Sequence, residues 1–229
     1  FAILNGEHDW ETGLAYFRRA VETNPDSIPG HFWMETYYLQ TRRFDDALAE
    51  AQIVRELEPH SILGWHLLAW IYFHSKQYDK AIAAHAQMLA KPSPYSFGYF
   101  TYSCALRMGG NFAEAIDKAQ QAIEFQPENP MYQIGLAAAY AAAGKREEAE
   151  KELNEILIIS AEKYVSPYLL ATVYITLGDR EKTFEQLEKA VEIHDTWTNW
   201  VTVDPQFESL RDDARYEEIL RLIKHPLAK

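Results

Sequence analysis

ILGWHLLAWIYFHSKQYDKAIAAHAQMLAKPSPY, residues 62–95, is the stretch that decides the fold. Its two halves meet at a polar joint, residues 75–77, and each half has apolar residues spaced three and four apart, as on one face of an α-helix. These stripes are Trp65, Leu68, Ala69 and Tyr72 in the first half and Tyr78, Ala81, Ile82, His85 and Met88 in the second. The stretch therefore predicts two short amphipathic helices joined by a tight turn.

The same pattern recurs every 34 residues along the chain. The small residue Ala81 has equivalents at this spacing, namely Gly13, Ala47, Ala115, Ala149 and Thr183. A second series of small residues lies in the first helix of each pair, at Ala69, Ser103, Ala137 and Ala171. Two helices cross closely where a small side chain meets a large one. A period held without an insertion indicates stacked helix pairs.

The repeat resembles the tetratricopeptide repeat, a 34-residue helix-turn-helix unit. The matching residues of the third repeat are Trp65, Leu68, Ala69, Tyr72, Tyr78 and Ala81, and the expected proline appears as Pro25, Pro59 and Pro127. Two positions depart from the pattern: Glu35 replaces the small residue of the second repeat, and Ser93 stands where proline is expected. The resemblance covers roughly residues 1–197. It implies an all-α fold, a right-handed α-solenoid of about six units with a C-terminal capping helix.

The period also predicts the domain boundaries. The solenoid spans residues 1–197, with a partial repeat at about 1–27 and further repeats at 28–61, 62–95, 96–129, 130–163 and 164–197. Residues 198–229 leave the repeat, and we expect them to cap its apolar end. Within them, Asp204 should cap a short helix running to about Arg211, and Asp213 a helix over residues 214–223. Because the chain enters the repeat late, we expect a fragment of a longer protein, cut inside a repeat.

A narrower resemblance lies near the C-terminal end. Residues 164–192, YVSPYLLATVYITLGDREKTFEQLEKAVE, followed by residues 203–220, VDPQFESLRDDARYEEIL, resemble the end of the repeat region in multidomain bacterial signalling proteins. In those proteins the repeats follow a winged-helix DNA-binding domain, a cyclase domain or a Ser/Thr kinase domain. The resemblance implies a regulatory or sensory module.

Composition and motifs exclude several functions. The net charge of −12 argues against binding a nucleic-acid backbone. No apolar run approaches the ~18 residues that span a bilayer. The sequence holds no phosphate loop, nucleophile elbow or paired-cysteine motif, so we expect a non-enzyme without cofactor or metal. The lone Cys104 should be a small packed residue. We expect a soluble protein, with the cytoplasm slightly favoured over the periplasm.

The predicted binding surface is the concave side, which the first helix of each pair should line. Its exposed aromatic and polar residues would form a groove suited to an extended or helical peptide. The candidate groove residues are Phe32, Thr36, Leu39, Gln40, Leu63, His66, Trp70, Phe73, His74, Phe100, Arg107 and Tyr168. For Phe32 and Phe100, packing against the next helix is the open alternative. Repeat proteins that clamp a C-terminal carboxylate use lysine, arginine and asparagine in the groove. Arg107 is the only such residue among these candidates, which disfavours a carboxylate clamp.

Three functions follow from this surface. The first is a module that binds a protein or peptide partner, for instance the effector domain of the same chain. The second is a small-molecule sensor, which an enclosed pocket near Trp70 would favour over an open strip. The third is an assembly module that self-associates through the truncated N-terminal repeat. If Trp70 lines an open groove, Trp70→Ala should weaken binding and leave the fold largely intact.

Overall fold

The computed structural model describes residues 9–90 and 95–228. The start of the expected partial repeat, residues 1–8, and the departure at Ser93 lie outside them. The described residues form α-helices, two 3-10 helices and no strand, which confirms the all-α class. The helices are α1 (Trp10–Thr23), α2 (Ile28–Gln40), α3 (Phe44–Leu57), α4 (Ile62–His74), α5 (Tyr78–Met88), α6 (Ser96–Met108), α7 (Phe112–Phe125), α8 (Pro130–Ala142), α9 (Arg146–Ile159), α10 (Pro167–Leu177), α11 (Arg180–Glu192), η2 (Thr198–Trp200), η3 (Pro205–Leu210) and α12 (Ala214–Leu222).

Local sequence fixes where these helices begin and end. The side chain of Asn129 accepts a hydrogen bond from the backbone N–H of Met131, with Pro130 in the first turn of α8. Asp204 and Asp213 cap η3 and α12 in the same way, as the sequence predicted. The helix α10 ends at Gly178, whose φ of 83° is the left-handed conformation that glycine adopts readily.

The small residues of the period lie where helices cross. Ala47, Ala81, Ala115 and Ala149 are all fully buried, in α3, α5, α7 and α9. At one crossing, the hydroxyl of Ser103 in α6 donates a 2.7 Å hydrogen bond to the carbonyl of Ala115 in α7. Small side chains let the helices of one pair approach closely, so each pair forms a rigid unit and the units stack on one another.

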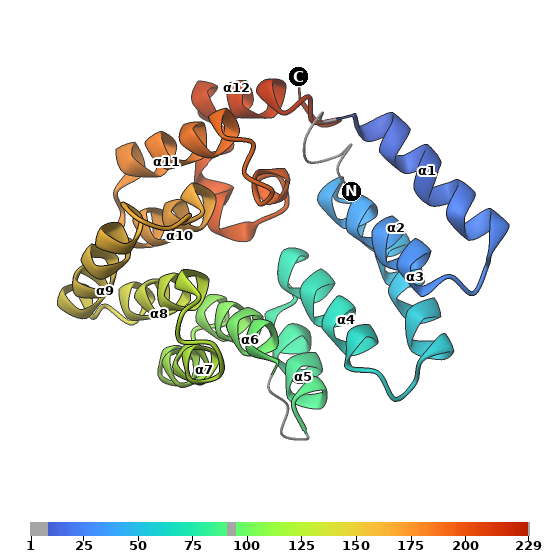
Figure 1. The fold of residues 1–229 in the computed structure, drawn as a ribbon, viewed down its shortest axis with the longest axis horizontal. Helices are drawn as coiled ribbons and strands as arrows, with labels where there is room; N and C mark the ends of the chain where they lie inside the picture. The colour runs from blue at the N-terminus through green and yellow to red at the C-terminus, as the bar shows by residue number, and fades with distance from the viewer. Residues whose placement is uncertain (1–8, 91–94, 229) are drawn as a thin grey trace.

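The stacked pairs curve into an arc, and the C-terminal residues turn back into it (Figure 1). The helix α12 packs beside α11, where Arg215 forms ion pairs with Glu181 and Glu188. The chain then reaches the start of the solenoid: the indole N–H of Trp10 in α1 donates a 3.2 Å hydrogen bond to the carbonyl of Ile223. The solenoid is therefore closed into a ring by its own C-terminus, which was not predicted from the sequence.

Candidate ligand-binding site on the concave side

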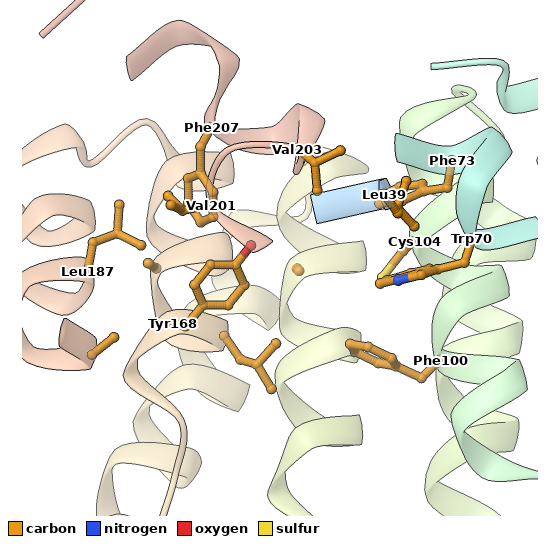
Figure 2. Packing of buried hydrophobic residues seen from close by; sticks show 14 of the residues in the cluster. Leu39, Trp70, Phe73, Phe100, Cys104, Tyr168, Leu187, Val201, Val203 and Phe207 are labelled. Carbon is orange, nitrogen blue, oxygen red and sulfur yellow. The ribbon is translucent and has the colours of Figure 1, made fainter. Parts of the chain in front are cut away.

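The concave side is largely covered by residues 195–211, which we call the inner segment. Its apolar side chains point toward the first helices of the solenoid: Val203 lies near Leu39 and Phe73, and Phe207 lies near Tyr168 (Figure 2). Val201, Val203 and Phe207 are each at most 1 % exposed. The inner segment thus adds a second apolar layer to the face that the sequence predicted to be an open groove.

Two tryptophans of the inner segment pack against this face. The ring of Trp200 stacks on His74, with centroids 5.1 Å apart, and meets Trp70 edge-on at 5.7 Å. The ring of Trp197 stacks on Tyr168 at 6.4 Å and lies 6.1 Å from Phe97. Aromatic contacts of this kind add to the stabilisation by area burial, so Trp70 and His74 belong to the interior.

Hydrogen bonds fix the inner segment at several points. The hydroxyl of Tyr168 donates to the carboxylate of Asp204 at 2.9 Å, and the guanidinium of Arg107 donates to the side-chain oxygen of Gln206 at 2.6 Å. The hydroxyl of Thr202 donates to the backbone carbonyl of Gln40 at 2.9 Å. Because Arg107 is only 6 % exposed and bonded to its own chain, it does not present a free cation to a ligand.

Little space remains between the inner segment and the middle of the concave side. A cavity of about 20 Å³ remains between α4, α6, α8 and α10, bounded by Trp70, Arg107, Tyr168 and Trp200. This volume holds about one water molecule. Around this small cavity the predicted groove is therefore packed, and a second, more open hollow of about 160 Å³ lies beside it, lined by Arg107, Met108, Ala142, Ile175, Thr176, Pro205 and Gln206.

A larger cavity lies toward the N-terminal half, between α2, α4 and the inner segment. Its volume is about 260 Å³, a little below the range of pockets for drug-sized ligands. It is lined by Phe32, Trp33, Glu35, Thr36, Gln40, His66, Leu67, Trp70, Phe97, Thr196, Trp197 and Trp200. Aromatic walls with a few polar groups are typical of a binding pocket, and this one has the size of a single large side chain or small ligand.

Two ionisable groups in the wall of this cavity are neutral near pH 7. Burial raises the pKa of Glu35 to about 8, and the negative charge of Glu50 acts in the same direction, whereas a hydrogen bond from Thr36 opposes it. Burial lowers the pKa of His66 to about 4. The empty cavity therefore carries no net charge from these two groups at neutral pH.

The structure divides the predicted groove residues into two sets. Those that line the larger cavity are Phe32, Thr36, Gln40, His66 and Trp70. Those under or beside the inner segment, or packed in the core, are Leu39, Leu63, Phe73, His74, Phe100, Arg107 and Tyr168. The prediction of one open groove along all of these residues is wrong. The inner segment of the same chain, or packing in the core, covers most of them.

The cavity also contains residues that the sequence analysis did not place in a binding site. Trp33, Leu67, Phe97, Thr196 and Trp197 were not predicted to lie in a binding site, and Trp200 was assigned to the capping residues 198–229. Glu35 departs from the repeat pattern, but the pattern alone gives it no role. An acidic residue in a slot that is otherwise small was the one signal that could have pointed to the cavity.

The fold defines the class of this protein as a helical-repeat solenoid. Three segments match family models described as Tetratricopeptide repeat, at residues 36–97, 106–166 and 168–194. Together these matches cover well over half of the chain, and they confirm the predicted repeats. The chain belongs to the tetratricopeptide repeat family, whose members commonly mediate protein–protein interactions and whose fold is generally a non-enzymatic scaffold.

Two curated relatives match parts of the chain. It is 40 % identical over 78 residues to the TPR repeat-containing thioredoxin TTL4 of Arabidopsis thaliana, a match over 34 % of this chain and 11 % of that protein. It is 33 % identical over 105 residues to the cytochrome c-type biogenesis protein CycH of Rhizobium meliloti strain 1021, over 44 % of this chain and 28 % of that protein. The chain thus spans less than a third of either relative.

Solved structures show the same fold at low identity. The APC/C hetero-tetramer Cut9-Hcn1 matches with a TM-score of 0.63 at 13 % identity, over 96 % of this chain and 44 % of that one. TTC0263, a TPR protein of Thermus thermophilus, matches with a TM-score of 0.58 at 19 % identity, over 85 % and 100 %. YrrB, described as a TPR protein with an unusual peptide-binding site, matches with a TM-score of 0.50 at 17 % identity, over 81 % of this chain and 96 % of that one.

In the part of the chain that the structure describes, no helix is long and apolar enough to cross a membrane.

Proposed function

We propose that this chain is a non-enzymatic interaction module that takes a side chain of a peptide or protein partner into the larger cavity. The observation that carries the proposal is the cavity itself, about 260 Å³ of space with aromatic walls on the concave side. A buried aromatic pocket is where interfaces concentrate their binding energy. The proposal differs from the sequence-based one in placing the contact at the N-terminal half of the groove only.

We propose further that the module regulates a larger bacterial signalling protein. The support is the resemblance of residues 164–192 and 203–220 to the repeat regions of such proteins. Closure by the inner segment suits this role. A partner that binds better when this segment is either docked or released would shift the protein toward that conformation. The partner would then be a protein segment, including one from an effector domain.

A second candidate function is a small-molecule sensor. The specific observation in its favour is that Trp197 and Trp200 form one wall of the cavity, so it is partly enclosed by the chain itself. An enclosed pocket next to Trp70 suits a compact ligand better than a long peptide does.

A peptide array probed with the full chain tests the proposed function. Wild type should retain a subset of peptides, and Phe32→Ala, which removes a cavity wall, should weaken their binding by about tenfold or more. Phe125→Ala is the matched control, because Phe125 is an exposed phenylalanine of α7 away from the cavity. Retention of no peptide, or equal weakening by both variants, would contradict peptide binding in the cavity.

A further inference from the structure

The starting observation is the position of Glu35 in the repeat. Its equivalents in the later first helices are Ala69, Ser103, Ala137 and Ala171, all of them buried small residues. Glu35 is itself 1 % exposed, so a carboxyl group lies where the fold needs only a small side chain. Burying a carboxyl group is costly without compensation, and packing of the helix pair gives no reason for it.

The polar contacts of Glu35 leave one oxygen unused. The hydroxyl of Thr36 lies 3.2 Å from Oε2 and 3.0 Å from the backbone carbonyl of Phe32, so these two acceptors share its one proton. For Oε1, the described residues provide no hydrogen-bond partner. Glu35 also lines the larger cavity. Buried polar atoms are nearly always satisfied in native structures, and in this wall Oε1 of Glu35 and Nδ1 of His66 both lack a partner among the described residues, which a hydrogen-bonding group entering the cavity would supply.

The rest of the wall indicates the charge of that group. Among the described lining residues none is lysine or arginine, and four are tryptophans, Trp33, Trp70, Trp197 and Trp200. Trp70, Trp197 and Trp200 also stack on neighbouring rings. Aromatic faces attract cations, tryptophan most strongly, and the whole chain has a net charge of −12. We propose that the cavity selects a cationic group, the guanidinium or ammonium at the end of an arginine or lysine side chain, with Glu35 as its counter-ion. This inference rests on the proposed function, which makes the occupant part of a peptide.

Binding a cation in this cavity should release a proton. The raised pKa of Glu35, about 8, means that its carboxyl is protonated in the empty cavity at pH 7, and a cation would favour the ionised form. The titratable groups near it are His66 of α4, whose pKa of about 4 keeps it neutral above pH 5, and the pair of His31 and Glu50, 2.5 Å apart, between α2 and α3. Residues 196–200 contain no titratable side chain.

The test compares two isosteric peptides on the full chain. The probes are acetyl-Ala-Arg-Ala-amide and the same tripeptide with citrulline, which keeps the shape of arginine and removes its charge. Titration calorimetry or tryptophan fluorescence at pH 8 should give at least about tenfold tighter binding of the arginine probe, a preference equivalent to one pKa unit. Between pH 6 and 8 its affinity should rise at least about fivefold, the change expected when binding lowers the pKa of Glu35 from about 8 by one unit.

Variants assign the preference to Glu35. Glu35→Gln keeps the shape of the side chain and should abolish both the arginine preference and the pH dependence. Glu114→Gln, which removes an acid of α7 outside the cavity, should leave both unchanged. A readout without ligand checks the placement of Glu35: the melting temperature of Glu35→Gln relative to wild type should be higher at pH 8 than at pH 5, because only wild type must keep a carboxyl neutral at pH 8.

The outcomes separate this inference from the proposed function. Equal binding of the two probes, tighter binding at lower pH, or an arginine preference that survives Glu35→Gln would overturn the cation site while peptide binding stands. Failure of both probes together with an empty peptide array would overturn the proposed function. Tighter binding of free agmatine than of the arginine tripeptide would likewise overturn a peptide as the source of the cation.

Discussion

Trp70 shows how a residue on the concave side becomes part of the interior. It lies on α4 and borders both cavities of the concave side, but it is 8 % exposed because Phe73, His74 and Trp200 surround it. The expectation that Trp70→Ala leaves the fold largely intact assumed an open groove. That assumption is wrong, because Trp200 lies against Trp70. The repeat pattern does not reveal this contact, because Trp200 is outside the period.

We therefore expect Trp70→Ala to lower the free energy of unfolding by about 3–5 kcal/mol, the usual cost of removing a large buried aromatic side chain. Phe32→Ala should cost less, because Phe32 is only half-buried at the cavity wall. Urea unfolding of both variants beside wild type measures the difference. A loss below about 1 kcal/mol for Trp70→Ala would show that the inner segment does not cover it in solution.

At the same scale, the sequence revealed Glu35 but not its surroundings. A charged residue in a small slot can be recognised from the 34-residue period alone, by comparison with Ala69 and Ser103. The cavity next to it depends on Trp197 and Trp200, which are about 160 residues further along the chain and outside the period. Sequence spacing therefore identified the unusual residue, whereas its site required the tertiary structure.

Among elements, the crossing of paired helices is the most predictable feature. Ala81 of α5 is fully buried against α4, whereas Ala83 on the same helix is exposed. Ala81→Leu should overpack the crossing and cost about 1–3 kcal/mol of unfolding free energy. Ala83→Leu adds the same side chain to the surface and should stay within about 0.5 kcal/mol of wild type. Chemical denaturation of the two variants checks this, and equal stabilities would contradict the crossing geometry.

Helices and the inner segment differ in how far sequence determines them. The helix pairs follow from short-range spacing, small residues at crossings and caps such as Asn129, so their bounds could be predicted closely. The inner segment and the helix that follows it have no 34-residue period. The caps at Asp204 and Asp213 predicted η3 and α12 but not where they dock. Its position depends on buried partners such as Tyr168 and Arg107, whose hydrogen bonds to it no local pattern specifies.

For the whole molecule, closure of the ring is the property that distinguishes this chain from an open solenoid. It is held by contacts between residues far apart in sequence, such as Thr202 with Gln40 and Trp10 with Ile223, separated by 162 and 213 positions. An open solenoid has contacts only between neighbouring repeats, and its stability is a sum over them. The closing contacts couple the two ends, so we expect the ends to open together, ahead of the central helix pairs.

His225 makes this closure sensitive to acid. Its ring meets Trp10 edge-on at 4.6 Å, and its Nδ1 accepts a hydrogen bond from the backbone N–H of Leu227, which requires an unprotonated nitrogen. Burial lowers the pKa of His225 to about 4, against 6.5 for an exposed histidine, although a contact with the backbone of Gln40 opposes the shift. The opened form therefore binds a proton that the closed form excludes, so closure is fully favoured above about pH 6.5 and weakens as the pH falls toward 4.

Hydrogen exchange of residues 195–203 and 223–228, followed from pH 7 to pH 4.5 and corrected for the intrinsic rate, measures this opening. In wild type the protection of these residues should fall faster than that of α8, by up to about 1.4 kcal/mol per pH unit for one histidine. His225→Gln keeps an acceptor for Leu227 without a titratable group and should remove this part of the pH dependence. His60→Gln replaces an exposed histidine and should behave as wild type. If His225→Gln opens with the same pH dependence as wild type, buried groups elsewhere on the ring, such as His74 beneath Trp200, control its closure instead.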